Sequence, residues 1–407
     1  MDRRRFLTAA AGLAAGTVVS GCGGCSGGGA NTIKIVSSLP RTGSAQAQTD
    51  TIVNGIRMAL DDYGGEVGGF KIKYEDKDDA TAAQGQWDAS KEADNAREAV
   101  GDADVMGFIG PYNSGAAGNS MPILNEAGLV QISPACTWPG LTKKVPGNEE
   151  SGEPGIYRKS GKITFTRVCP TDTIQAPYSA VFVKELGVKS VYVLDDKEMY
   201  GAGIAKLFAQ KCRDLGIEVL GHESIVATQQ NFKTVIQGVK AKNPGLLYFG
   251  GTSQSGGPQI VIDMKGEGLR CPIMVPDGCY EKAFVDAAGA DTFKDITCYA
   301  TFGGKGPTEL TGAGGEFVTK YKAKYKIDPE AYAVYGYEAG KVLLEAIKAV
   351  GKKDREAIRA AVVGTKDFDK GAVGKWSFDA DGDTTVRELT ISKVEGWPFK
   401  QVKSITG

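Results

Sequence analysis

Residues 108–137, FIGPYNSGAAGNSMPILNEAGLVQISPACT, decide the fold that the rest of the chain follows. The apolar run at 105–109 lacks alternation, which is typical of a parallel strand buried on both faces. A break follows at 110–113, and Ser114 stands where a helix N-cap is expected. A second strand, at 129–133, ends in the loop 134–137. The stretch therefore predicts strand, loop, helix, strand and loop.

The two loops of this stretch follow the ends of neighbouring strands. In an open parallel sheet such loops line one crevice, and a helix N-terminus is a ready site for an anion. We therefore expect Ser114, Ala135 and Thr137 to converge on one small anionic group, such as a carboxylate. The alternative is that Ser114 only caps its helix.

The N-terminus carries processing signals. Residues 2–7, DRRRFL, form a twin-arginine pattern before a short Ala-rich run, which predicts an export signal. The run ends in Val-Ser-Gly-Cys, which resembles a bacterial lipobox. We predict a signal peptide over 1–21, a lipid on Cys22 and a Gly/Ser tether over 22–30. No other apolar segment is long enough for a membrane, so we expect an exported protein, lipid-anchored on the periplasmic side of a bacterial membrane.

Composition narrows the function. The chain has 48 basic and 49 acidic residues, which argues against a nucleic-acid binder. Its 407 residues favour two domains over a single core. Export permits disulfides, and Cys271 with Cys279, or Cys136 with Cys169, are possible pairs that the sequence leaves open.

Catalytic and metal-binding motifs are missing from the sequence. There is one histidine, and neither a Gly-x-Ser-x-Gly elbow nor paired metal ligands accompany it. The acidic stretch 379–383 lacks the spacing of a calcium loop, and we interpret it as a hairpin turn. We therefore expect no enzyme activity, no cofactor and no metal.

Strands and helices alternate from residue 32 onward. Strands are predicted at 33–36, 70–74, 105–109, 129–133, 163–168, 191–194, 218–220, 246–249, 273–275 and 296–301. Helices are predicted at 49–63, 83–100, after Ser114, and near 174–186, 202–215, 231–241, 257–267, 331–350 and 355–363. A surface insertion at 143–162 separates two runs of these units. Two successive runs predict an α/β protein of two doubly wound lobes.

The chain from Thr32 to about Val402 resembles the periplasmic branched-chain amino-acid-binding proteins, the type I solute receptors of ABC importers. The resemblance rests on motifs that are specific in combination: Leu39-Pro40-x-Thr42-Gly43, Asn54-Gly55, Ile109-Gly110, Ile132-Ser133-Pro134-Ala135, Asp196 to Tyr200-Gly201, Tyr248-Phe249-Gly250-Gly251, Trp376-Ser377-Phe378-Asp379 and Gly382-Asp383. It implies a Venus-flytrap fold in which three chain crossovers form a hinge. Lobe I would hold 31–170 and 302–387, and lobe II would hold 171–301 and 388–407.

The resemblance also implies a ligand site between the lobes. Ser114, Ala135 and Thr137 match positions that hold the ligand's α-carboxylate in the family. Tyr200 and Asp277 match positions near its α-ammonium, although Asp277 replaces a longer Glu. A carboxylate and a ring face suit an ammonium group. The alternatives are a solvated loop acid and a surface aromatic.

Two predicted pocket positions depart from the family. Gln48 and Thr252 stand where aromatic rings line the side-chain pocket of leucine binders, and Trp138 is a possible replacement wall. Polar walls suit an apolar side chain poorly, which shifts the prediction toward a smaller or more polar amino acid. Amide or urea receptors and receptors for other small carboxylates remain alternatives.

The implied partners follow from the family. We expect a monomeric receptor that captures an amino acid and delivers it to the permease and ATPase subunits of an ABC importer, with no nucleic acid involved. Presentation of the ligand to a separate sensor is the alternative.

Overall fold

The computed structural model describes residues 31–227 and 229–406. The predicted signal peptide at 1–21, the lipidation site Cys22 and the tether at 22–30 lie outside the described residues. Within these residues, the helices are all too short or too polar to cross a membrane.

The first sheet has six strands in the order β2-β3-β1-β4-β5-β6. They are β1 Thr32–Leu39, β2 Glu66–Val67, β3 Phe70–Asp78, β4 Val105–Ile109, β5 Gln131–Ser133 and β6 Phe165–Arg167. All pairings are parallel except that of β2 with β3. The run at 105–109 is fully buried, as expected for a strand covered on both faces.

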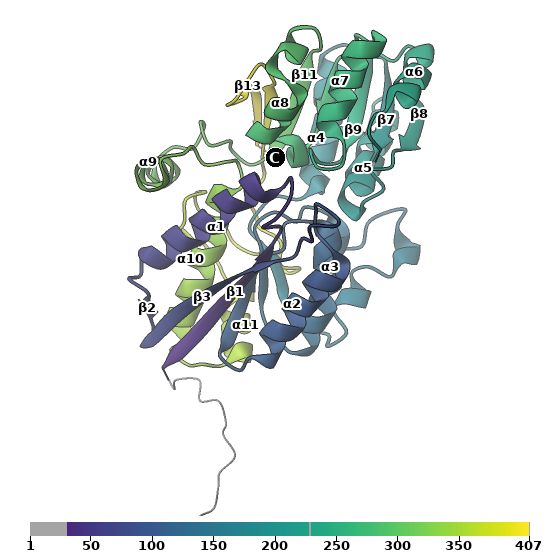
Figure 1. Cartoon of the computed structure of the whole chain (residues 1–407). Coiled ribbons are helices and arrows are strands. Elements are labelled where there is room, and N and C mark those ends of the chain that lie inside the picture. The colour runs from purple at the N-terminus through teal and green to yellow at the C-terminus, as the bar shows by residue number, and fades with distance from the viewer. Residues whose placement is uncertain (1–30, 228, 407) are drawn as a thin grey trace, which may run out of the picture. The chain divides into compact units, whose positions relative to one another are not determined.

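Helices cover both faces of this sheet (Figure 1). They are α1 Gln46–Asp61, α2 Ala89–Gly101, α3 Ser114–Glu126, α10 Ala333–Val350 and α11 Arg355–Val363. Helix α1 packs along α10, and α2 packs against α3. The α1–α10 approach needs small residues, because a Cβ on Gly55 would lie 2.2 Å from the carbonyl oxygen of Ala333. We call this sheet with these helices lobe I.

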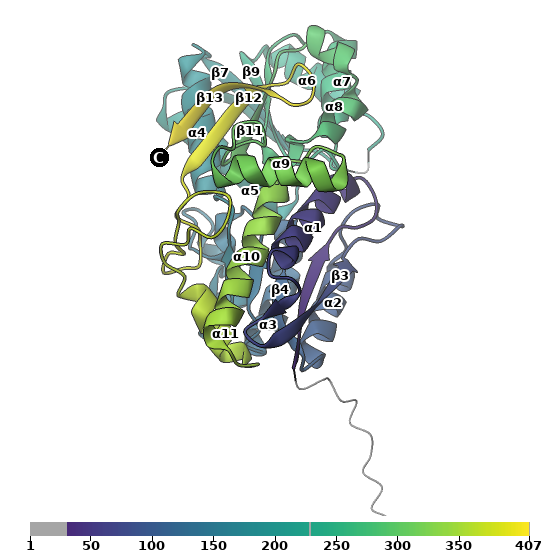
Figure 2. The same cartoon turned by 90° about the vertical axis from the view of Figure 1, so that its left-hand side faces the viewer.

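The second sheet has seven strands in the order β13-β12-β11-β10-β9-β7-β8. They are β7 Ser190–Asp195, β8 Glu218–Ser224, β9 Leu246–Gly250, β10 Ile273–Val275, β11 Cys298–Gly303, β12 Glu388–Lys393 and β13 Lys400–Thr406. The antiparallel pair β12–β13 forms one edge, seen as the yellow arrows in Figure 2.

Helices α4 to α8 accompany the second sheet, and together they make lobe II. Their bounds are α4 Asp172–Glu185, α5 Met199–Asp214, α6 Lys233–Lys242, α7 Gly257–Glu267 and α8 Lys282–Ala288. Helix α9, Ala313–Tyr325, lies between β11 and α10 in the chain.

The chain passes between the sheets three times. It leaves the first sheet after β6, leaves the second after β11, and returns to the second at β12. The expected fold class, two doubly wound lobes joined by a three-crossover hinge, is confirmed. The residue boundaries predicted for the lobes stay a prediction.

One local expectation needs correction, and a question that the sequence left open is answered. The N-cap of α3 is Asn113, whose backbone is extended, and Ser114 is the first helical residue, so Ser114 does not cap the helix. The six cysteines of the described part of the chain are free thiols, so neither possible disulfide forms there. Burial raises the pKa of the Cys136 thiol to about 12.

Candidate functional site

The candidate site lies at the carboxyl ends of strands from both sheets. Ser114 follows β4 and Ala135 follows β5 in lobe I, whereas Tyr200, Thr252 and Asp277 follow β7, β9 and β10 in lobe II. In each sheet the strand order reverses beside these strands, at β1–β4 and at β7–β9. Such switch points are where open α/β sheets bind ligands.

One small cavity brings these residues together. Its walls are Tyr112, Asn113, Ser114, Ala135, Tyr200, Thr252, Asp277 and Gly278. Its volume of about 20 Å³ holds a water molecule but no amino acid. The walls from the two lobes are therefore in contact, and entry of a larger ligand requires them to separate.

Asp277 is the buried acid at the centre of the lobe II wall. Its carboxylate accepts hydrogen bonds from the hydroxyl of Tyr200, 2.6 Å away, and from Gln175 and Tyr332. Burial raises the pKa of Asp277, and these three hydrogen bonds oppose the rise. Tyr332 precedes α10 of lobe I, so this carboxyl group connects the two lobes in the closed arrangement.

Ser114 presents the opposite wall. Its hydroxyl oxygen accepts a 3.3 Å hydrogen bond from the backbone N–H of Trp138, which leaves the hydroxyl hydrogen free to donate. The first backbone N–H groups of a helix lack intrahelical partners and carry the positive end of the dipole. The start of α3 therefore offers donors to an anion, while Asp277 offers acceptors to a cation.

Three predicted site residues do not line this cavity. The hydroxyl of Thr137 donates to Asp172, 3.1 Å away. Gln48 is fully buried in α1, and both polar atoms of its side chain lack a hydrogen-bond partner within the described residues.

Trp138 is the third, and it packs in a cluster with Ala117, Met121 and Phe165 of lobe I. Its ring also faces α5 of lobe II, because a Cβ on Gly203 would lie 2.3 Å from it.

Sequence reasoning missed residues that hold or line the site. Tyr112 and Asn113 directly precede Ser114, so their place in the same loop was an available signal. Gln175 and Tyr332 gave no local signal, because they lie 102 and 55 residues from Asp277 in the chain.

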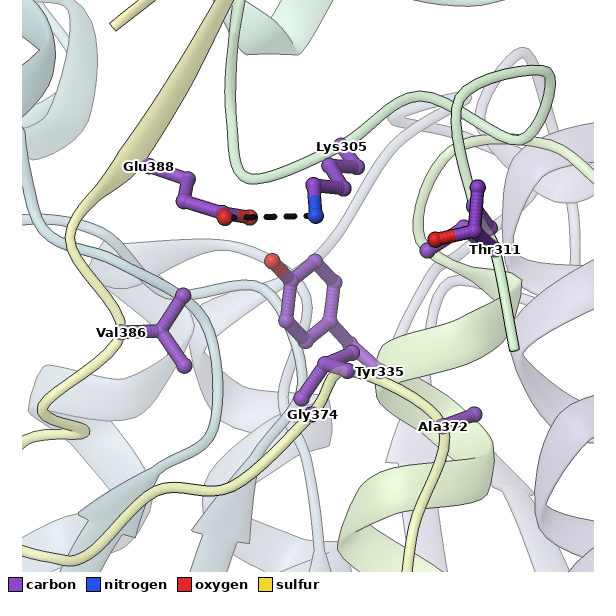
Figure 3. Close-up of a pocket in the computed structure, with 9 residues that line it drawn as sticks. Lys305, Thr311, Tyr335, Ala372, Gly374, Val386 and Glu388 are labelled. Carbon is purple, nitrogen blue, oxygen red and sulfur yellow. Dashed lines mark ion pairs between the residues drawn. The ribbon is translucent and has the colours of Figure 1, made fainter. Parts of the chain in front are cut away.

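Larger cavities lie beside the crossovers, and their polar groups are less suited to a ligand. One of about 130 Å³ is lined by Lys305, Tyr335 and Glu388 among others. Figure 3 shows Lys305 facing Glu388, and their charged atoms lie 3.3 Å apart. The Tyr335 hydroxyl donates to the carbonyl of Gly303. Each of these three polar side chains therefore already has a partner within the protein. Another cavity, of about 370 Å³, is lined mainly by prolines, Leu310, Val318 and Trp397.

No metal site accompanies the cavity. Across residues 31–227 and 229–406, no three or more His, Cys, Asp or Glu side chains are arranged to hold a metal ion. The aspartates of the 379–383 turn are instead engaged by cations, since Lys143 pairs with Asp379 and Arg167 with Asp383.

Two doubly wound lobes with facing donors and acceptors define the class of two-lobed solute receptors. A family model described as "Periplasmic binding protein" matches residues 32–398. The chain belongs to this family of solute-binding receptors, and the expected family is confirmed.

Proteins similar in sequence are named as amino-acid-binding proteins. A Leu/Ile/Val-binding protein, BraC3 of Rhizobium johnstonii, is 27% identical over 364 residues, which cover 88% of this chain and 90% of that protein. An amino acid binding protein of Pseudomonas aeruginosa is 26% identical over 86% of this chain and 87% of its own length.

Solved structures show the same fold. A leucine binding protein of Thermotoga maritima matches with a TM-score of 0.81 at 25% identity, covering 92% of this chain and 99% of that one. A branched-chain amino acid transporter substrate binding protein of Streptococcus pneumoniae, in complex with isoleucine, matches with a TM-score of 0.77 at 26% identity, covering 91% and 99%.

Proposed function

We propose that this protein is the extracytoplasmic receptor of an ABC importer and that it captures an amino acid between its lobes. One observation carries the proposal: an anion-binding helix start, at Ser114, and a buried acid, Asp277, face one cavity from opposite lobes. An amino acid offers a carboxylate and an ammonium on one carbon, which matches this separation of donors and acceptors. The names of the relatives above agree with it.

Capture proceeds by lobe closure. The ligand carboxylate binds the start of α3 and Ala135 of lobe I, and lobe II then closes with Asp277 and Tyr200 on the ammonium. Closure requires contacts that exist only in the closed state, and the Asp277–ammonium pair is such a contact. Micromolar affinity corresponds to about −8.2 kcal/mol, of which a few charge-assisted hydrogen bonds at about 1.5–3 kcal/mol each supply a large part.

The cognate amino acid is smaller or more polar than leucine. Thr252 lines the cavity with a short side chain whose hydroxyl is hydrogen-bonded to Ser255, where a large apolar ligand side chain would need more hydrocarbon. Gln48, Thr137 and Trp138 keep the roles predicted from the resemblance only if opening rearranges them, because they lie outside the present cavity lining.

Anchoring and delivery complete the proposal. A twin-arginine signal exports the protein, a lipid on Cys22 holds it at the membrane, and the closed monomer docks on a permease with its ATPase subunits. The protein itself catalyses nothing. A receptor for amides, urea or other small carboxylates, or one that presents ligand to a sensor, is the alternative.

Thermal unfolding with a ligand panel tests the function. The purified mature protein, refolded and dialysed, is heated with amino acids, amides, urea and small carboxylates in turn. Ligand at a hundred times its dissociation constant adds about 2.7 kcal/mol of stability, which raises the melting temperature measurably.

We expect amino acids to shift the melting temperature. Stabilisation only by amides, or by acids without an amine, would contradict the amino-acid assignment and the role given to Asp277. The exposed variant Asp291→Asn should respond like the wild type, which controls for a general loss of surface charge.

A further inference from the structure

A second cavity, also of about 20 Å³, continues the candidate site between the lobes. It shares four lining residues with the first cavity: Asn113, Ser114, Tyr200 and Thr252. Its remaining walls are Gln86, Trp87 and Gly115 from lobe I and Asp196, Glu198 and Ser255 from lobe II. The side chain of a ligand held in the first cavity would therefore pass the shared residues and enter the second.

The lobe II wall of the second cavity carries two acids. Asp196 is buried and accepts hydrogen bonds from the Ser255 hydroxyl at 2.6 Å and from the backbone N–H of Glu198 at 3.0 Å. The Glu198 carboxylate has neither a hydrogen bond nor an ion pair with any of the described residues. Burial raises the pKa of Asp196 to about 7 and raises that of Glu198 as well. No Lys, Arg or His is among the residues that line the cavity in the described part of the chain.

A third acceptor faces the cavity from lobe I. Asn113 lines both cavities, and its side-chain oxygen is buried without a hydrogen-bond partner within the described residues. An unpaired buried acceptor costs about 1–3 kcal/mol, so a donor from the ligand would stabilise the complex here.

Trp87 lines the second cavity from lobe I. Its backbone is fixed by a bridge between Ala80 and Trp87 and by the adjacent hydrogen bond from Asp88 to Asp79. Its ring lies against the first turn of α3, because a Cβ on Gly115 would lie 2.6 Å from ring carbon Cζ2. An indole face packs against methylene groups and attracts cations.

We propose that the second cavity binds the ligand's side chain, and that this side chain ends in a cation, so that the cognate ligand is a basic amino acid. The methylene stem packs on Trp87, and the terminal cation pairs with Glu198 and Asp196. The inference rests on the proposed function, since the carboxylate and ammonium must already be held at the first cavity.

Titration calorimetry with L-arginine and L-citrulline tests the inference. The two amino acids have nearly the same size and shape, but only arginine carries a side-chain charge. We expect the mature wild-type protein to bind arginine at least about tenfold more tightly than citrulline, since the charged hydrogen bonds to Glu198 are the stronger ones. Glu198→Gln should remove most of that preference while leaving citrulline affinity within about twofold.

Two further variants separate the contributions. Glu218→Gln, at an exposed acid of the same lobe, should leave both affinities unchanged. Trp87→Ala should weaken arginine and citrulline together, because it removes the surface under the stem.

The outcomes distinguish the two proposals. Equal binding of arginine and citrulline, or an arginine preference that survives Glu198→Gln, overturns the basic-ligand inference. Binding of L-leucine without binding of arginine also overturns it and leaves the amino-acid receptor standing. Absence of binding by every amino acid overturns both.

Discussion

Two buried acids at strand ends differ in the hydrogen-bond donors around them, although each lies near a second buried acid. Asp277 follows β10 and accepts hydrogen bonds from Tyr200, Tyr332 and Gln175. Asp79 follows β3 and is fully buried, yet neither of its carboxyl oxygens has a hydrogen-bond partner among the described residues. The charged side chain with the largest effect on the pKa of Asp79 is another buried acid, Glu92. Glu92 itself accepts a hydrogen bond from Ser38.

The difference separates the acid proposed to bind the ammonium from a pair of acids that keeps protons. Burial raises the pKa of both carboxyl groups, but around Asp277 three donors favour the ionised form. Around Asp79, the Glu92 carboxyl adds repulsion to burial, and the positive charge of Arg41 offsets only part of the rise in pKa. Asp277 therefore has the ionised state that its proposed contact with a ligand ammonium requires, whereas the Asp79–Glu92 pair keeps protons.

Removal of Asp277 should have the largest effect. Asp277→Ala leaves the ligand ammonium without its charged partner, a loss of about 3–5 kcal/mol for a buried pair, or more than about 100-fold in affinity. Calorimetric titration with the best ligand of the panel measures it. Circular dichroism should show an intact fold. Asp79→Asn is the matched control and should leave affinity unchanged. Wild-type affinity in Asp277→Ala would contradict the assignment of Asp277 to the ligand ammonium.

The Asp79–Glu92 pair should make stability depend on pH. Burial raises the pKa of Glu92 from 4.5 to about 8, so the folded protein keeps protons that the unfolded chain has released. Stability is therefore fully present below about pH 4.5 and is lost as the pH rises through about 8, by about 5 kcal/mol in all, at about 1.4 kcal/mol per pKa unit. Urea unfolding at pH 5 and pH 8 measures the difference.

Variants on α2 identify the source of that slope. Glu92→Gln should flatten it and raise stability at pH 8. Glu98→Gln alters an acid whose pKa is lowered by its hydrogen bond from Lys77, so it should leave the slope unchanged. A slope that persists in Glu92→Gln would remove the proton-holding role.

The Tyr332 hydroxyl should have a smaller effect on binding. Tyr332→Phe removes one donor to Asp277, which raises the pKa of the acid further and weakens its charge. One hydrogen bond to a charged group contributes about 1.5–3 kcal/mol, and because solvent or ligand replaces part of it we expect about a tenfold loss of affinity. Tyr335→Phe removes a hydroxyl bonded only to Gly303 and should bind normally. Equal losses in both variants would contradict a specific role for Tyr332.

The smallest effect is expected at Ser38. Ser38→Ala removes the hydroxyl that donates to Glu92 and leaves that acid still less favourable in its ionised form. The midpoint of the pH–stability curve should move upward by less than about one unit. A downward shift would mean that Ser38 does not stabilise the carboxylate.

Most of the fold could be predicted from the sequence because buried parallel strands are short apolar runs. The runs at 105–109 and 273–275 coincide with β4 and β10, and the helices predicted at 257–267 and 355–363 coincide with α7 and α11. Helices α8 and α9 were not predicted. Helix α9 follows a stretch rich in Gly, whose low helix propensity hides the start of a helix that tertiary packing stabilises.

The site could be predicted in part. Ser114, Ala135, Tyr200, Thr252 and Asp277 follow strand ends, and the structure places all five around one cavity. Tyr332 reaches Asp277, and Trp87 reaches the second cavity, only through the packing of segments distant in the chain. No local sequence pattern therefore predicts their place in the site. Their roles in binding stay predictions until ligands are measured.

The contact between Trp138 and Gly203 sets how closely the lobes can approach. Because a Cβ at residue 203 would lie only 2.3 Å from the indole ring, a single added carbon there would clash with Trp138 and keep the two lobes apart. That carbon would touch no ligand. It would lower the fraction of molecules with closed lobes, and the apparent affinity would fall in proportion to that fraction. A glycine at one helical position of lobe II is thus a steric requirement for closure of the lobes.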